Sequence, residues 1–248
     1  MLTKKFLEHF GRYLMMLGGM FSKPENWRVY WKEFMHQCND IGIGSLGIVL
    51  IISVFLGAVT TVQTAYQLVS PIIPKPVIAQ IVRDSTILEL SPTVVCIVLA
   101  GVVGSKIASE LGNMRVSEQI DALEIMGINT KAYLIMPKIL GAIIMIPCLV
   151  ILSCFLAIGG GYMAGGLSGI LSQEQFKQGL LQSFIPFNVY FAVIKAFSFA
   201  FIISSISAYF GYNVKGGALE IGKASTTSVV VSCILILFAD YGLAAVFL

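Results

Sequence analysis

The chain has 248 residues, of which 57% are hydrophobic and only 12% are charged, and its net charge is +3. A soluble domain usually carries about a quarter charged residues. One buried core cannot absorb this much apolar surface at this length, so the composition excludes an ordinary soluble domain. The sequence also lacks the basic run that marks a nucleic-acid-binding arm. We therefore expect a membrane domain that has no nucleic-acid partner.

The first 40 residues have the pattern of amphipathic helices at a membrane surface. Aromatic and basic residues alternate in the second half of this segment: Arg28, Tyr30, Trp31, Lys32 and Phe34. This mixture suits the headgroup layer of a bilayer. A helix buried against the rest of the protein is the alternative. We expect residues 1–40 to be an N-terminal amphipathic interfacial segment and residues 41–248 to be the membrane domain.

Five apolar stretches follow, and each is a candidate transmembrane helix. They cover residues 43–67, 90–105, 140–165, 187–210 and 225–247. Crossing about 30 Å of hydrocarbon takes about 20 helical residues. The second stretch has only 16 residues between Glu89 and Lys106 and spans about 24 Å. Either Glu89 or Lys106 is therefore expected at or inside the membrane boundary. The predicted fold is an all-α integral membrane protein with five transmembrane helices after the interfacial segment.

Small residues recur every four positions in the second stretch and beyond it. They are Ala100, Gly104, Ala108 and Gly112. Residues at this spacing lie on one face of a helix, and their small size lets another helix approach closely. We expect a close helix contact along this ridge.

The distribution of Lys and Arg predicts the orientation in the membrane. Twelve of these residues lie in the N-terminal segment and in the regions 106–138 and 211–224, whereas three lie on the opposite side: Lys75, Arg83 and Lys177. Because cytoplasmic loops carry an excess of Lys and Arg, we expect a cytoplasmic N-terminus. Five spans then place the C-terminus outside.

The sequence contains no recognisable catalytic motif. Gly217 to Lys223 reads G-A-L-E-I-G-K and is nearly a P-loop, but Ala224 stands where the magnesium-binding hydroxyl belongs. The segment also connects two membrane spans, whereas a P-loop follows a strand of an α/β sheet. The chain has no HExxH or GxSxG motif and only two histidines. We expect this chain to have no catalytic residue, no metal site and no bound cofactor.

A short helix is predicted between the second and third spans, at about residues 117–128. Ser117 can cap its N-terminus. At 100° per residue, the apolar and small residues share one face, and the acidic residues share another. The first face holds Val116, Ile120, Leu123 and Gly127, and the second holds Glu118, Asp121 and Glu124. This pattern fits an ordinary surface helix and a helix that docks into a cytoplasmic partner equally well.

Three charged residues fall within or beside the apolar spans. Lys195 and Asp240 stand almost equally far from the loop between the fourth and fifth spans, so an antiparallel hairpin brings them to similar depth. Glu89 lies at the outer end of the second span. A charge near the bilayer centre costs at least about 2.5–3.5 kcal/mol by insertion scales, so it usually faces a partner or a wet cavity. The alternatives are a structural ion pair and a polar region with a transport function.

Several motifs resemble those of MlaE-type permeases, the membrane subunits of ABC lipid transporters that work with MCE proteins. The most specific is S-E-Q-I-D-A-L-E-I-M-G-I at 117–128. Others are E-L-S-P at 89–92, A-G-x-x-G-S at 100–105, I-K at 194–195 and G-K-A-S-T-T at 222–227, together with Asp240. The resemblance extends from about residue 40 to the end of the chain.

The resemblance implies a homodimeric permease that encloses a lipid cavity in the bacterial inner membrane. Two cytoplasmic ATPase subunits would hold the ATP and magnesium, and a ring of MCE domains would sit on the outer side. The implied cargo is phospholipid, moved between the inner and outer membranes. A stand-alone ion-coupled transporter and a membrane scaffold protein remain alternatives of other classes.

The resemblance also assigns roles to residues. It places Glu89, Lys195 and Asp240 near the lipid cavity and the segment 117–128 in the helix that couples to the ATPase. The expected coupling residues are Glu118, Asp121, Leu123, Glu124, Met126 and Gly127. The acidic ones are expected to meet basic or polar groups of the ATPase. Some members of the family carry a basic residue directly before the glutamate of E-L-S-P, but this chain has Leu88.

Overall fold

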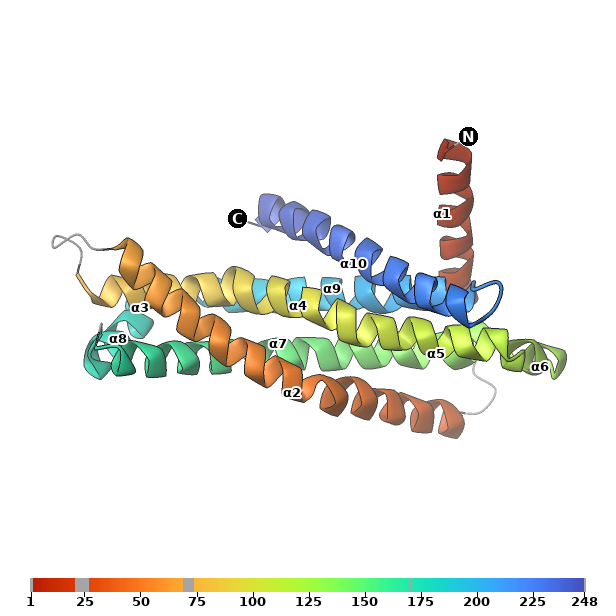
Figure 1. Ribbon diagram of the computed structural model, residues 1–248, viewed down its shortest axis with the longest axis horizontal. Helices are drawn as coiled ribbons and strands as arrows, with labels where there is room; N and C mark the ends of the chain where they lie inside the picture. The colour runs from red at the N-terminus through yellow and green to blue at the C-terminus, as the bar shows by residue number, and fades with distance from the viewer. Residues whose placement is uncertain (1, 21–26, 69–73, 170, 248) are drawn as a thin grey trace. The chain divides into compact units, whose positions relative to one another are not determined.

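The computed structural model describes residues 2–20, 27–68, 74–169 and 171–247 (Figure 1). Over these residues the chain is helical and contains no strand. Five helical runs are long and apolar enough to cross a membrane, and the helix α1 (Leu2–Gly19) precedes them. The predicted all-α membrane fold is confirmed.

The helices follow one another with few interruptions. After α1 come α2 (Trp27–Gln67), α3 (Pro76–Ser85), the π-helix η1 (Thr86–Val94), α4 (Val95–Leu99), the π-helix η2 (Ala100–Gly104), α5 (Ser105–Val116), α6 (Gln119–Ile125), the π-helix η3 (Lys131–Ile135), α7 (Met136–Leu167), α8 (Gln173–Leu181), α9 (Pro186–Tyr212) and α10 (Ala218–Phe247). The five candidate spans are Arg28–Gln67, Pro76–Val116, Lys131–Leu167, Pro186–Tyr212 and Ala218–Phe247.

The helices extend beyond the apolar stretches seen in the sequence. Helix α2 runs through residue 40 without a break, so the expected boundary between the interfacial segment and the membrane domain lies inside a helix. Two short helices, α3 and α8, were not expected from the sequence. Helix α3 begins with Pro76 in its first turn, where proline is well tolerated. Helix α8 begins with a capping box, in which Ser172 and Gln175 bond each other's backbone N–H groups.

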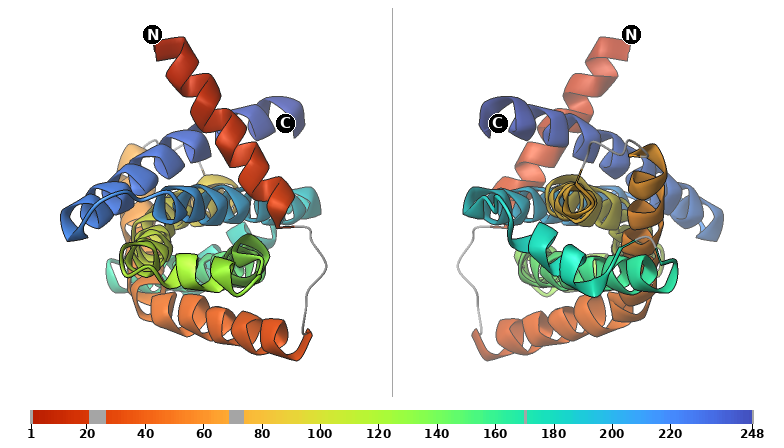
Figure 2. Two further views of the ribbon diagram at one scale, coloured as in Figure 1. Left: turned by 90° about the vertical axis from the view of Figure 1, so that its right-hand side faces the viewer. Right: turned by 90° about the vertical axis from the view of Figure 1, so that its left-hand side faces the viewer.

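The chain forms two compact units, and each of the five long helical runs contributes residues to both. Unit 1 comprises Met1–Ile41, Leu99–Met145 and Ala200–Ile236. Unit 2 comprises Gly42–Val98, Ile146–Phe199 and Leu237–Leu248. Figure 2 gives two further views of the ribbon, in which α1 and α6 belong to unit 1 and α3 and α8 belong to unit 2.

Small residues hold the helices of unit 1 close together. The predicted ridge is confirmed: Ala100 and Ala108 are fully buried, and a Cβ on Gly104 would lie 2.8 Å from Ser207 Oγ of α9. A Cβ on Gly112 would lie 3.2 Å from a methyl group of Ile221 at the start of α10. The ridge is thus occupied by contacts within the chain.

Two ion pairs also join helices of unit 1. Lys106 Nζ lies 3.0 Å from Asp40 Oδ2, and Lys138 Nζ lies 2.7 Å from Glu110 Oε1. The Lys138 side chain is almost fully buried, so removing one partner of its ion pair would destabilise the protein more than breaking the exposed pair. Both pairs tie α5 to a neighbouring helix, α2 in the first pair and α7 in the second.

In unit 2, glycines bring α2 and α7 into backbone contact. A Cβ on Gly57 would overlap the backbone carbonyl of Ala157, and a Cβ on Gly160 would overlap the carbonyl oxygen of Val54. In the same unit, α3 packs on α8 through a small core of Ile78, Ala79, Val82, Leu171 and Phe176. Helix α3 also contacts η1, the element that carries Glu89 of the charged site described next.

Candidate functional site

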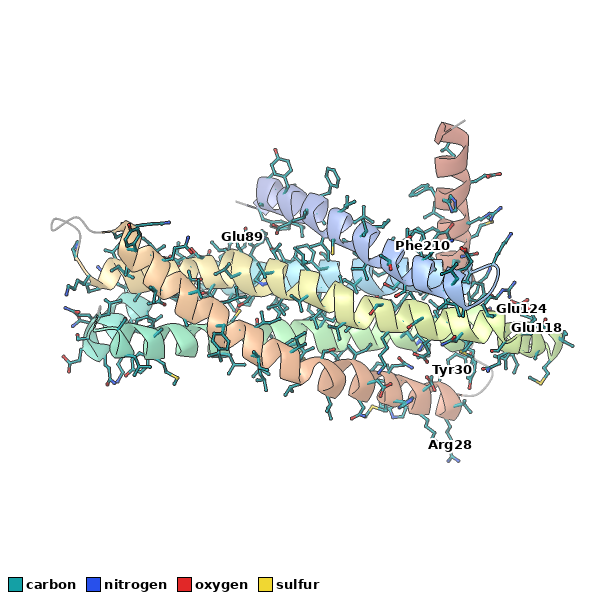
Figure 3. All side chains as sticks on the ribbon, viewed as in Figure 1. Arg28, Tyr30, Glu89, Glu118, Glu124 and Phe210 are labelled. Carbon is teal, nitrogen blue, oxygen red and sulfur yellow. The ribbon has the colours of Figure 1, made fainter. Side chains whose placement is uncertain are left out.

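Glu89 lies in the π-helix η1, which is part of the second candidate span. This segment contains Pro92, which has no backbone N–H and cannot continue an α-helical hydrogen-bond ladder. The wider turns of a π-helix accommodate such an interruption and are frequent at functional sites. The α-helical pattern resumes at Val95, whose N–H bonds the Pro92 carbonyl. Glu89 is labelled in Figure 3.

Lys195 of α9 lies between two carboxylates of unit 2. Its Nζ atom is 2.7 Å from Asp240 Oδ1 of α10 and 2.9 Å from Glu89 Oε1 of η1. It also donates to the backbone carbonyl of Leu88 at 3.0 Å. The ammonium group has three N–H donors, and three oxygen atoms lie within 3.0 Å of it. The structure thus brings together the three charges that the sequence singled out.

Two neighbours of this cluster were missed in the sequence. The Thr93 hydroxyl lies 3.2 Å from Asp240 Oδ1 and 3.3 Å from Glu89 Oε2. Its position four residues after Glu89 was the available signal, because residues four apart share a helix face. Phe191 lies under the Lys195 ammonium, 4.8 Å from ring centre to Nζ, which is a cation–π geometry. One turn of helix separates Phe191 from Lys195.

The three charges differ in exposure. The Lys195 side chain is 0% exposed, Asp240 is 17% exposed and Glu89 is 50% exposed. With all three ionised, the cluster has a net charge of −1. Glu89 is therefore the member that a ligand or a counterion can reach. Lys195 can hold it in place, and Asp240 balances the buried cation from the other side.

The predicted docking helix is shorter than expected. It is helix α6, and the residue before it, Glu118, has a left-handed backbone with φ of 58° and forms no side-chain cap. The prediction that Ser117 caps this helix is wrong, because the Ser117 hydroxyl donates to the Asn113 carbonyl of the preceding helix at 2.7 Å. The chain makes a sharp turn between α5 and α6 instead.

The two acidic residues of α6, Asp121 and Glu124, both bond within the chain. Asp121 Oδ1 lies 2.6 Å from Arg115 Nη1. Glu124 Oε1 accepts hydrogen bonds from the Tyr212 hydroxyl at 2.9 Å and from Thr130 Oγ1 at 3.1 Å. Glu118 and Glu124 are labelled in Figure 3. The bonds of Asp121 and Glu124 therefore hold α6 against the rest of its own chain.

The exposed tip of α6 is apolar. Ile125 is 87% exposed and Met126 is 66% exposed, whereas Ile120 is fully buried. Leu123 is half-buried and Gly127 is exposed, with a φ of 81° that favours glycine. Of the six expected coupling residues, Met126, Gly127 and Glu118 thus face outward most clearly. Ile125, which was not among the expected coupling residues, also faces outward.

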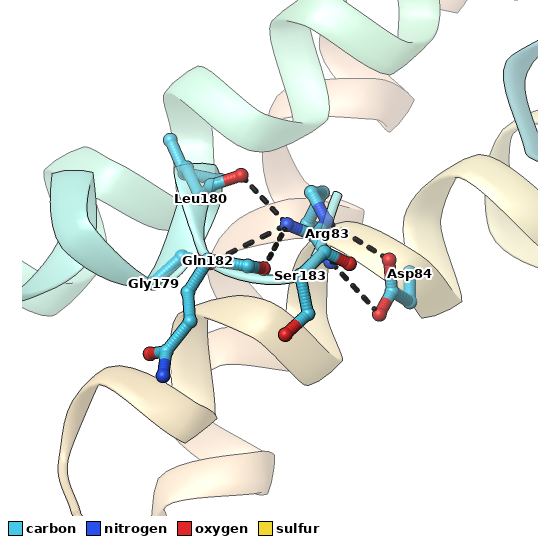
Figure 4. A network of polar contacts seen from close by, with 6 residues as sticks. All are labelled: Arg83, Asp84, Gly179, Leu180, Gln182 and Ser183. Atoms are coloured by element: carbon cyan, nitrogen blue, oxygen red, sulfur yellow. Dashed lines mark hydrogen bonds and ion pairs between the residues drawn. The ribbon is translucent and has the colours of Figure 1, made fainter. Parts of the chain in front are cut away.

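A third polar assembly, centred on Arg83, was counted in the sequence only as an outer-side charge. The Arg83 side chain is almost fully buried. Its guanidinium donates to Asp84 at 2.9 and 3.1 Å and to the backbone carbonyls of residues 179, 180, 182 and 183 (Figure 4). Arg83 thereby ties the end of α8 to α3, since the last carbonyls of a helix lack intrahelical partners.

The described part of the chain offers no metal site, because no three His, Cys, Asp or Glu side chains converge there. The P-loop-like residues Gly217–Lys223 form the first turns of α10 and the residue before it.

Comparisons with known proteins identify the class of the chain. Residues 34–246 match the family described as Permease MlaE. A probable ABC transporter permease protein of Rickettsia bellii is 38% identical over 86% of this chain and 82% of its own length. A probable ABC transporter permease protein of Synechocystis is 30% identical over 86% of this chain and 81% of its own length. The Arabidopsis thaliana chloroplast protein trigalactosyldiacylglycerol 1 is 30% identical over 89% of this chain and 63% of its own length.

These matches and the five apolar helices define a membrane permease. The chain belongs to the MlaE permease family, as the resemblance of its motifs indicated.

Proposed function

We propose that this chain is the membrane subunit of an ATP-driven transporter that moves phospholipid between the inner and outer membranes of a bacterium. In this proposal it lies in the inner membrane with its N-terminus in the cytoplasm and its C-terminus in the periplasm. Two cytoplasmic ABC ATPase subunits bind ATP and magnesium, and a ring of MCE domains continues the path on the outer side. The chain itself hydrolyses no ATP.

The observation that carries the proposal is the charge cluster on the apolar spans. A fully buried lysine with two carboxylates costs more to build than an apolar contact of the same size, so a function that needs polarity explains it best. The half-exposed carboxylate of Glu89 gives the pathway a polar group that a zwitterionic or hydrated headgroup can bind transiently. Lys195 and Asp240 keep that carboxylate in one position.

The lipid cargo has support from a relative. The Arabidopsis protein carries the name of a galactolipid, trigalactosyldiacylglycerol, and a lipid with two acyl chains needs a wide apolar path. The five helices of one chain pack closely through glycine contacts, which leaves little room inside one copy. A homodimer would supply that room. Helix α10 is the least buried of the five candidate spans and carries Asp240, so it is the surface that we expect a second copy to cover.

The ATPase contact is assigned to the tip of α6. ABC transporter permeases act with ATPases, and the exposed pair Ile125 and Met126 offers an apolar knob for a groove on that subunit. Asp121 and Glu124 then act inside the permease: they bond Arg115, Tyr212 and Thr130 and so pass movement of α6 to α5 and α9.

The test is purification of the tagged chain from its native membrane, with mass spectrometry of the associated proteins and lipids. We expect an ABC ATPase, an MCE-domain protein and phospholipid to co-purify with two copies of this chain. A chain that is active in transport without an ATPase would point to an ion-coupled transporter. A chain whose removal leaves lipid traffic unchanged would point to a scaffold. Either result contradicts the proposal.

A further inference from the structure

Helix α1 is anchored to α9 by two side-chain contacts in unit 1. His9 Nδ1 lies 2.8 Å from the hydroxyl of Tyr209, and the rings meet edge to face. The Tyr13 hydroxyl donates to Ser205 Oγ at 2.9 Å. Burial raises the pKa of Tyr13, so this phenol keeps its proton and remains a donor at neutral pH. Phe210, which follows Tyr209 on α9, is labelled in Figure 3 and marks this part of unit 1.

A pocket of about 370 Å³ with both charged and apolar lining residues lies between α1, the end of α9 and the start of α10. Its charged lining residues are Arg12, Lys215, Glu220 and Lys223, and His9 and Tyr209 form part of its wall. Two of its lining residues, Glu220 and Lys223, belong to the P-loop-like segment Gly217–Lys223, which the proposed transport function leaves unexplained. None of its residues belongs to the Glu89 cluster or to α6.

The pocket has a positive charge that the protein does not neutralise. Three cations and one carboxylate give its lining a net charge of +2, with His9 counted as neutral. The carboxylate of Glu220 is already paired with Lys223 at 2.7 Å. Arg12 and Lys215 are exposed and form no ion pair with any residue whose position the structure describes. The positive end of the α10 helix dipole adds to this field.

The helix α1 and the start of α10, which both contribute residues to the pocket, also carry exposed apolar side chains. On α1, Leu7, Phe10, Leu14 and Met15 are exposed, and Leu219 at the start of α10 is 75% exposed. Basic side chains beside exposed apolar ones are the pattern of a helix lying in the interface of a membrane with anionic lipids. A soluble phosphate needs the cations but gives no reason for the exposed apolar residues.

We propose that this pocket binds the phosphate of an anionic phospholipid in the leaflet that contacts α1. Arg12 and Lys215 hold the phosphate, and Lys223 stays near it while paired with Glu220. The acyl chains lie along the apolar side of α1. The bound lipid joins α1 to the turn between α9 and α10 and is separate from the transported cargo.

The experiment measures lipid binding to the full-length chain in detergent by native mass spectrometry. Phosphatidylglycerol and phosphatidylcholine are titrated against the wild type and against the double variant Arg12→Gln with Lys215→Gln. Each cation near a membrane surface contributes about a fivefold factor in affinity for anionic lipid, so the double variant should bind phosphatidylglycerol roughly 25-fold more weakly. Phosphatidylcholine binding should not change. Equal phosphatidylglycerol affinity in the variant and the wild type would overturn the proposal.

Two further variants control for charge and folding. Lys75→Gln with Lys177→Gln removes the same charge at exposed sites outside the pocket and should leave phosphatidylglycerol binding unchanged. Arg12→Lys with Lys215→Arg keeps the charge and should retain binding. A loss in the first control, or in the charge-preserving variant with an unchanged melting temperature, would contradict the assignment.

Two further measurements distinguish a lipid phosphate from a soluble anion and from a protein partner. Inorganic phosphate or ATP in large excess should not displace phosphatidylglycerol, because neither offers acyl chains. Displacement by either one would make the ligand a soluble anion. If the Arg12 and Lys215 double variant instead loses its ATPase subunit in a pull-down and keeps its lipid affinity, the pocket is a protein contact and the lipid proposal fails.

Discussion

Replacing Lys195 by methionine should destabilise the protein more than replacing either of its acidic partners. Methionine fills a similar volume but removes the only cation that the described residues place within reach of the two carboxylates. Asp240 is 17% exposed and would remain a largely buried charge without its partner, whereas Glu89 is 50% exposed and can be solvated. Removing one partner of a buried ion pair costs about 3–5 kcal/mol.

The acidic replacements should cost less, and in a fixed order. Asp240→Asn leaves Lys195 in contact with Glu89 and the Leu88 carbonyl, so its cost is that of one charged hydrogen bond, about 1.5–3 kcal/mol. Glu89→Gln removes a half-exposed group and should cost less than about 1 kcal/mol. The double variant Lys195→Met with Asp240→Asn should be more stable than the sum of the single losses predicts.

Thermal unfolding of the purified variants in one detergent measures this order. At roughly 2–4 °C per kcal/mol for a chain of this size, Lys195→Met should lower the melting temperature by about 6–20 °C. Lys177→Met, at an exposed lysine of α8, is the matched control and should change it little. A Lys195→Met protein as stable as the control, or a larger loss for Glu89→Gln than for Asp240→Asn, would refute the reasoning.

Three other predictions follow from the packing and the surface. Gly57→Ala should lower the yield of folded protein and cost about 1–3 kcal/mol, because the added Cβ overlaps a backbone carbonyl, while Gly44→Ala has open space and should be neutral; thermal unfolding compares them. Arg83→Met should speed hydrogen exchange at the end of α8, and unchanged exchange there would argue against the carbonyl clamp. Ile125→Ser with Met126→Ser should reduce ATPase co-purification without changing the melting temperature, and full retention of the ATPase would exclude the apolar tip as the docking surface.

Much of the fold could be predicted because hydropathy reports directly on membrane helices. The five spans and the small-residue ridge follow from local patterns, since lipid forces every backbone group into intrahelical bonds. The exact helix ends could not be found in this way. Helices α3 and α8 are short and held by contacts with each other, and such tertiary contacts leave no periodic signal in the sequence.

The candidate site could be predicted in part. Lys195 and Asp240 are almost equally far from the loop between their two helices, so the sequence predicted that they lie at similar depth. The structure adds that Lys195 contacts Glu89 as well. Rotation about the helix axis decides such contacts, and residue spacing alone does not fix it. The same limitation affected α6, where Asp121 and Glu124 have the pattern of an exposed acidic face but bond Arg115, Tyr212 and Thr130.

The most direct test of the proposed lipid pathway is lipid transfer by the reconstituted complex, scored in a double-mutant cycle of Lys195→Met and Asp240→Asn. Each variant is first shown to retain its ATPase subunit, so that lost transfer reports on the membrane path. We predict that either single change strongly reduces transfer and that the double variant transfers more lipid than the product of the two single effects. Strictly independent effects, or full transfer by Lys195→Met, would contradict a role for this charge cluster in moving lipid.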